Sequence, residues 1–142
     1  MADTVFNTFK QFTLNGEYDL LNEDVRVVLL SAAPDISTNV YYSDILGDEI
    51  TGVGYDTSGI ILSGNSVGTL PGSDVAYFDA DDVSWLNSTI TATHAALFQV
   101  MGNSSVSKLI GYLDFGGQVA SQNGEFSIQW NAQGILWIRP DA

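Results

Sequence analysis

The sequence contains no cysteine. It has only four basic residues against 17 acidic residues, and a single histidine. The absence of cysteine excludes disulfide bonds and thiolate metal ligands. The length of 142 residues still allows a sizeable buried core, so that neither a disulfide nor a metal is needed for stability. We therefore expect residues 1–142 to form a single domain.

The shortage of basic residues excludes two classes of partner. Proteins that bind nucleic acids neutralise phosphates with lysine and arginine, and anionic membranes attract the same side chains. The formal net charge here is −13, and the basic residues are Lys10, Arg26, Lys108 and Arg139. We expect no binding to nucleic acid or membrane, and a partner with a basic or neutral surface. An acidic surface alone also keeps a protein soluble without any specific partner.

The residues that are abundant favour β structure. Glycine, threonine, serine, asparagine and β-branched residues dominate, whereas good helix formers are sparse. Short links and the lack of long helices predict an all-β fold, an antiparallel β-sandwich that is jelly-roll-like or Ig-like. A helical turn is predicted at 42–46, and Asn-Ala-Gln-Gly at 131–134 predicts a hairpin between the last two strands. The predicted strands are 25–31, 59–63, 75–80, 83–85, 89–101, 109–115, 125–130 and 135–138.

The N-terminal residues 1–16 are the exception, because they predict a short helix or arm. Asp3 or Thr4 can cap this helix, and Gly16 can end it. Two interpretations stay open: the helix docks on the domain's own core, or it is an arm that docks on another subunit. The apolar face of the helix carries three phenylalanines spaced by three, Phe6, Phe9 and Phe12.

An acidic cluster lies between two predicted strands. The large apolar residues occupy even positions before the cluster, as at Phe78, and odd positions after it, as at Val83. A bend or bulge must absorb this slip of one residue, and aspartate suits such a place. The alternatives are a weak cation site, which needs about six oxygen ligands, and an acidic patch for a basic partner. The cluster consists of Asp79, Asp81 and Asp82.

Catalytic residues are not indicated. The single histidine, His94, lies in register with apolar residues on one face of its predicted strand. This position predicts a packed, hydrogen-bonded core residue rather than the base of a serine triad. The single histidine and the scattered aspartates show no metal-ligand spacing. We therefore expect a protein that is not an enzyme and binds no cofactor.

Tryptophan and tyrosine side chains allow two interpretations. Trp130 lies in register with Phe126 and Ile128 on the same face of its predicted strand, which predicts a core position. Trp137 lies between two aliphatic residues, so both faces of the last strand are apolar, and such a strand is either covered or part of a subunit interface. A row of exposed aromatic rings would instead form a platform for sugars, but the pattern favours an oligomer.

Four motifs, in this order, resemble those of small virion proteins of tailed bacteriophages: YYSDILGDEITGVGY, AYFDADDVSWLNSTITATHAALF, LIGYLDFGG and NGEFSIQWNAQGIL. The resemblance covers residues 6–138. It implies a capsid decoration (cement) protein, a small β-rich domain on the outer capsid surface. It further implies a homotrimer whose partner is the major capsid protein. The resemblance supplies no catalytic or ligand-binding residues.

The expected function is therefore to bind the outside of the phage head and stabilise it. Binding energy would come from an apolar patch, while an acidic rim would select basic capsid surface. The alternative is a tail or baseplate component, including a carbohydrate-binding or receptor-binding module. The residues predicted to contact the partner are Phe6, Phe9, Phe12 and Trp137.

Overall fold

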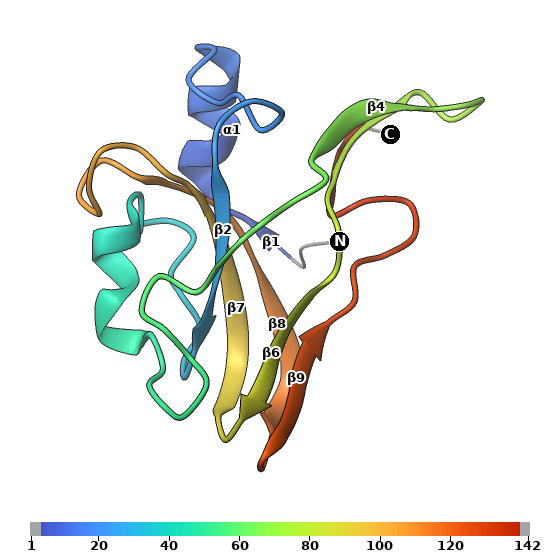
Figure 1. Cartoon of the computed structure of the whole chain (residues 1–142). Coiled ribbons are helices and arrows are strands. Elements are labelled where there is room, and N and C mark those ends of the chain that lie inside the picture. Colours follow the sequence, from blue (N-terminus) through green and yellow to red (C-terminus); the bar gives the residue numbers. More distant parts are fainter. Residues whose placement is uncertain (1–3, 140–142) are drawn as a thin grey trace.

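The computed structural model describes residues 4–139, and this part of the chain is mostly β, with antiparallel sheets in a sandwich-like arrangement (Figure 1). In chain order the elements are β1 (Thr4–Val5), α1 (Asn7–Leu14), β2 (Val25–Leu30), the 3-10 helix η1 (Tyr42–Asp48), β3 (Ile60–Ile61), β4 (Ser66–Leu70), β5 (Val75–Asp79), β6 (Val83–Ser88), β7 (Thr91–Gln99), β8 (Lys108–Ala120), β9 (Gly124–Ile128) and β10 (Leu136–Ile138).

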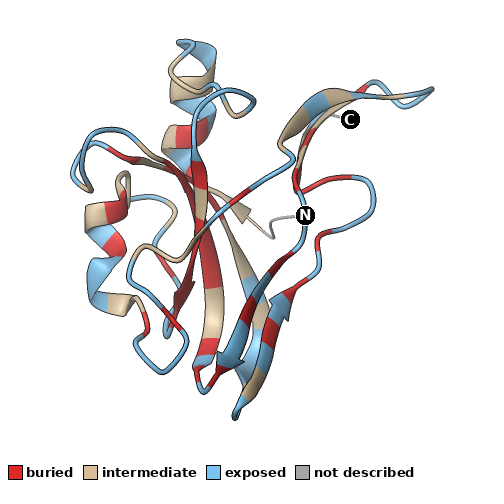
Figure 2. Ribbon diagram, viewed as in Figure 1, coloured by how far each residue is buried: buried red, intermediate tan, exposed pale blue. Residues whose placement is uncertain are grey.

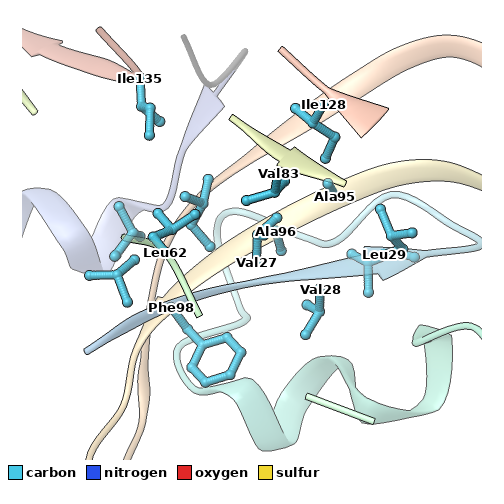
Figure 3. Close-up of a cluster of buried hydrophobic side chains, with 14 of the residues drawn as sticks. Val27, Val28, Leu29, Leu62, Val83, Ala95, Ala96, Phe98, Ile128 and Ile135 are labelled. Carbon is cyan, nitrogen blue, oxygen red and sulfur yellow. The ribbon is translucent and has the colours of Figure 1, made fainter. Parts of the chain in front are cut away.

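The largest sheet has the strand order β1-β8-β7-β2-β3. Its strand β2 was predicted from a nearly continuous apolar run, which is typical of a strand covered on both faces. The structure confirms this, because η1 covers one face of β2 and the strands β6 and β9 cover the other. Figure 3 shows Val28 and Phe98 on the side of η1, and Val83 and Ile128 on the opposite side. On the η1 side, the ring of Tyr42 stacks on that of Phe98 at 4.2 Å between centroids.

The second layer is a long bent ribbon made of two small sheets, β6-β9 and β10-β5-β4. Strands β5 and β6 follow one another along the chain, and so do β9 and β10. Because β5 pairs with β10 and β6 with β9, the segments 75–88 and 124–138 run antiparallel, side by side. Their pairing is interrupted where one small sheet ends and the other begins. The outer end of this ribbon, with β4, projects from the body of the molecule (Figure 1).

The predicted hairpin at 131–134 is wrong, because β9 and β10 pair with different strands rather than with each other. The expected turn chemistry is present: Gly134 N–H donates to the carbonyl of Asn131 at 2.9 Å, and Asn131 Oδ1 accepts from Gln133 N–H. However, the turn does not reverse the chain: it bulges out of the ribbon, and the chain then continues as β10, antiparallel to β5. Gly134 has φ +121°, and a Cβ there would lie 3.1 Å from the carbonyl oxygen of Phe78.

The N-terminal helix is present, but it begins later than predicted. Thr4 lies in strand β1, which pairs with β8, and Phe6 occupies the N-cap position without a side-chain capping bond. The other predicted cap, Asp3, lies outside the described residues. The predicted end is confirmed, because the helix ends at Leu14 and Gly16 has φ +73°.

The phenylalanine face of α1 packs on the domain's own core. Phe6 is 0% and Phe9 is 5% exposed, so the prediction that these two rings contact a partner is wrong. The physical reason is that β1 pairs with β8 and the next residue, Phe6, donates its N–H to the carbonyl of Ile110. These bonds place the start of α1 against that sheet. Phe12 is half-buried, and the Lys108 ammonium lies 5.6 Å from its ring centroid.

Burial is concentrated where the layers meet (Figure 2). The prediction of a core position for Trp130 is confirmed, since it is 8% exposed and its Nε1–H donates to the carbonyl of Asp81 at 3.0 Å. By contrast, β4 alternates between half-buried and exposed residues along its length. The outer sheet therefore has much less cover than the inner one.

Candidate functional site

An apolar groove separates α1 and the following segment from the three-stranded sheet. Its volume is about 350 Å³. One wall is formed by α1 together with residues 18–21, and the other by the sheet face that carries Val67, Phe78 and Ile138. These three side chains share a face because Val67 pairs with Phe78, and Ile138 pairs with Ala76, two residues before Phe78 on the same strand.

The groove exposes aliphatic side chains on both walls. Leu21 is 50%, Val67 is 55% and Ile138 is 57% exposed to solvent. Single exposed aliphatic residues are common on protein surfaces, but several gathered in one concave site mark an interaction surface. This is the feature that we assign as the candidate functional site.

The residues predicted to contact a partner do not come together. Among those four, all of which the structure describes, Phe9 lines the groove, and it does so as a buried part of the wall. Trp137 lies on the opposite face of β10 from Ile138, paired with Tyr77, and its Nε1–H donates to the carbonyl of Gln133 at 2.9 Å. Trp137 is half-buried, so its contact with a partner stays a prediction.

A polar cluster that no sequence pattern predicted lies under η1. The Glu49 carboxylate accepts hydrogen bonds from the Tyr42 hydroxyl, from the Tyr55 hydroxyl at 2.6 Å and from Ser58 N–H at 2.9 Å. The Tyr55 hydroxyl in turn accepts from Leu29 N–H of strand β2 at 3.1 Å. The cluster therefore fastens both η1 and the glycine-rich segment 51–59 to the central sheet.

Burial sets the protonation of the two phenols. It raises the pKa of Tyr42 from 10.0 to about 12, with the hydrogen bond to Glu49 adding to the effect. Burial also raises the pKa of Tyr55, again with help from Glu49. Both phenols are hydrogen-bond donors at neutral pH and both side chains are buried, so the arrangement stabilises the fold.

The acidic cluster forms the bend between β5 and β6. Asp82 Oδ1 accepts a hydrogen bond from Trp130 N–H at 2.9 Å, and Asp81 N–H donates to the carbonyl of Ser63 at 2.8 Å. Apolar residues on both sides of the cluster are buried, which confirms that the bend absorbs the slip of one residue. Asp79 is half-buried, and its Oδ1 has no hydrogen-bond partner. Within residues 4–139, no group of three or more histidine or acidic side chains could hold a metal ion.

His94 is packed and hydrogen-bonded, as predicted, but it is half-buried rather than a core residue. Its side chain is 13% exposed, Nδ1 lies 2.7 Å from Thr93 Oγ1, and Nε2 lies 3.6 Å from Asp114 Oδ1. The pairing of β7 with β8 shifts between Ala92 and His94, so the strict alternation that the sequence suggested is interrupted there.

Comparisons of the chain with protein-family models, with curated proteins and with solved structures found no match. In the part of the chain that the structure describes, no helix has the length and apolar character needed to cross a bilayer. The relation to phage virion proteins therefore stays a prediction from the sequence motifs.

Proposed function

We propose that this protein is a non-enzymatic structural component of a tailed-bacteriophage virion. It binds the outer surface of the head and stabilises the lattice of the major capsid protein. The observation that carries the proposal is the exposed apolar groove beside α1 on a chain with a net charge of −13. The order of the four sequence motifs supports the choice of a virion, and a homotrimer is the assembly that this resemblance implies.

The physical basis is the addition of contacts across capsid subunits. A head packed with DNA is under internal pressure, so a protein that contacts neighbouring subunits opposes their separation. Removing apolar surface from water supplies about 25 cal/mol per Å². The acidic surface around the groove favours basic capsid surface and raises the rate of association.

The direct test is co-sedimentation of the purified protein with expanded heads that lack it. We expect saturable binding at a fixed ratio to the major capsid protein, and weaker binding at higher salt because exposed charges are screened. The loaded heads should also release their DNA at a higher temperature than bare heads. An absence of binding to intact, expanded heads would overturn the proposal and direct the search to the tail, where a glycan array would test receptor binding.

A further inference from the structure

A second hollow adjoins the groove and has a different chemistry. Its volume is about 390 Å³, and the acidic residues Glu17, Asp19 and Glu23 are among those that line it. Tyr18 and Asp19 line both hollows, so one short stretch of chain forms the wall between them. We refer to this second hollow as the acidic pocket.

The shared wall is held rigidly on the large sheet. Gln99 is 2% exposed, and its Oε1 accepts a hydrogen bond from Asp19 N–H at 2.8 Å. The same side chain donates through Nε2 to the carbonyl of Glu17 at 3.3 Å. Tyr18 donates its hydroxyl to the carbonyl of Leu109 at 2.7 Å. The wall is therefore fixed before any partner binds, which lowers the entropic cost of association.

The charges on the segment that separates the two hollows are of one sign. The segment 17–24 carries four acidic residues and no basic residue. Lys108 Nζ lies 3.5 Å from Glu17 Oε1 and partly neutralises that carboxylate, whereas Asp19 and Glu23 are exposed to solvent. A second copy of this chain would bring two such segments together, and an anionic lipid surface would be repelled. A partner with basic side chains is therefore the favoured occupant.

We infer that the groove and the acidic pocket bind one continuous segment of the partner, with aliphatic side chains in the groove and a lysine or arginine in the pocket. This inference rests on the proposed function, because it assigns the segment to the capsid protein. An apolar cavity of about 150 Å³ holds a benzene-sized group, so the groove has room for about two large side chains. The partner's cation reaches the carboxylates across the wall formed by Tyr18 and Asp19.

The test uses the full chain with single substitutions in each hollow. Leu21→Ser and Val67→Ser remove exposed aliphatic side chains from the groove, and Glu23→Lys reverses a charge in the pocket. Matched controls are Leu86→Ser, at an aliphatic residue on β6 that is 62% exposed, and Glu125→Lys, at an exposed acid on β9. Thermal melts first establish that each variant is folded.

The readout is the dissociation constant for expanded heads at several salt concentrations. We expect each groove variant to bind at least about fivefold more weakly, Glu23→Lys about tenfold more weakly and with a shallower salt dependence, and both controls within about twofold of wild type. If the wild-type protein binds but the groove and pocket variants bind equally well, the inference is wrong and the proposed function stands. If the controls weaken binding as much as the variants do, a different surface makes the contact. If wild type does not bind intact heads, the proposed function itself fails.

Discussion

The two β layers of this protein differ in how completely they are covered. In the large sheet, neighbouring residues of β2 such as Val27 and Val28 point to opposite faces, and both are 0% exposed. In the three-stranded sheet, Val67 and Ile138 share a face and are both more than half exposed. The same type of aliphatic side chain thus belongs to the core in one layer and is exposed in a groove in the other.

This difference indicates where the fold tolerates change. Truncating a buried side chain costs the lost transfer free energy plus the cost of a cavity, whereas truncating an exposed one costs little. The buried polar cluster of Glu49 also belongs to the covered layer. Substitutions in the covered layer should therefore lower the free energy of unfolding, and substitutions in the groove should change binding alone.

The largest effect is expected for Phe6→Ala. Its ring is fully buried and lies 6.1 Å from that of Tyr112 between centroids. We expect a loss of about 3–5 kcal/mol in the free energy of unfolding, measured by urea denaturation. Phe12→Ala is the matched control on the same helix, with an expected loss of about 1 kcal/mol because that ring is half-buried. Equal losses would contradict the assignment of Phe6 to the core.

A smaller loss is expected for Glu49→Gln. The Glu49 carboxylate accepts three hydrogen bonds. An amide in its place would direct its own NH₂ group at one of these three donors, and that buried donor would lose its acceptor. We expect a loss of about 1–3 kcal/mol. Glu125→Gln, at an exposed position on β9, is the control and should be neutral. A neutral result for Glu49→Gln would show that the cluster does not fasten η1 to the sheet.

The two phenols predict a weakening of the fold at alkaline pH. The pKa of Tyr42 is raised from 10.0 to about 12, so the folded state holds this proton more tightly than the unfolded state does. The resulting stability is fully present below pH 10 and is lost as the pH rises through about 12. The urea midpoint should therefore fall over this range. Tyr42→Phe should flatten the fall, and Tyr77→Phe, outside the cluster, should not.

The smallest effect is expected in the groove. Val67→Ser should change the free energy of unfolding by less than about 0.5 kcal/mol, because its side chain is more than half exposed. Leu97→Ser is the contrasting variant, since Leu97 lies in β7 and is 0% exposed. A large loss for Val67→Ser would mean that the outer sheet contributes to stability as the inner one does.

Local patterns predicted part of the fold. The apolar run of β2 indicated a strand covered on both faces, and the shift from even to odd positions around the aspartates indicated the bend. The strand β4 was missed because Ser66 and Gly68 weaken the β signal of this short segment, and β4 forms by pairing with β5. Strand β8 extends to Ala120, past the prediction, because β7 continues to pair with it beyond Gly116 and Gly117.

The candidate site was predictable only in its chemistry. Composition indicated an acidic protein, and the spacing of apolar residues predicted a contact surface on the phenylalanine face of the helix and on the strand of Trp137. The structure places Phe6 and Phe9 in the core instead. The apolar last strand pointed to Ile138, but Leu21 and Val67 carried no signal, because no periodic pattern links residues so far apart in the chain.

The sequence by itself determined the sign of the charge and most of the longer elements. Apolar periodicity is a local property, so it decided the strand character of β2 and the core position of Trp130. Tertiary structure alone decided which strands pair: the turn at 131–134 has hairpin chemistry, yet β10 pairs with β5. The same long-range pairing creates the Glu49 cluster and the groove, because both join residues that only the packing of the layers brings together.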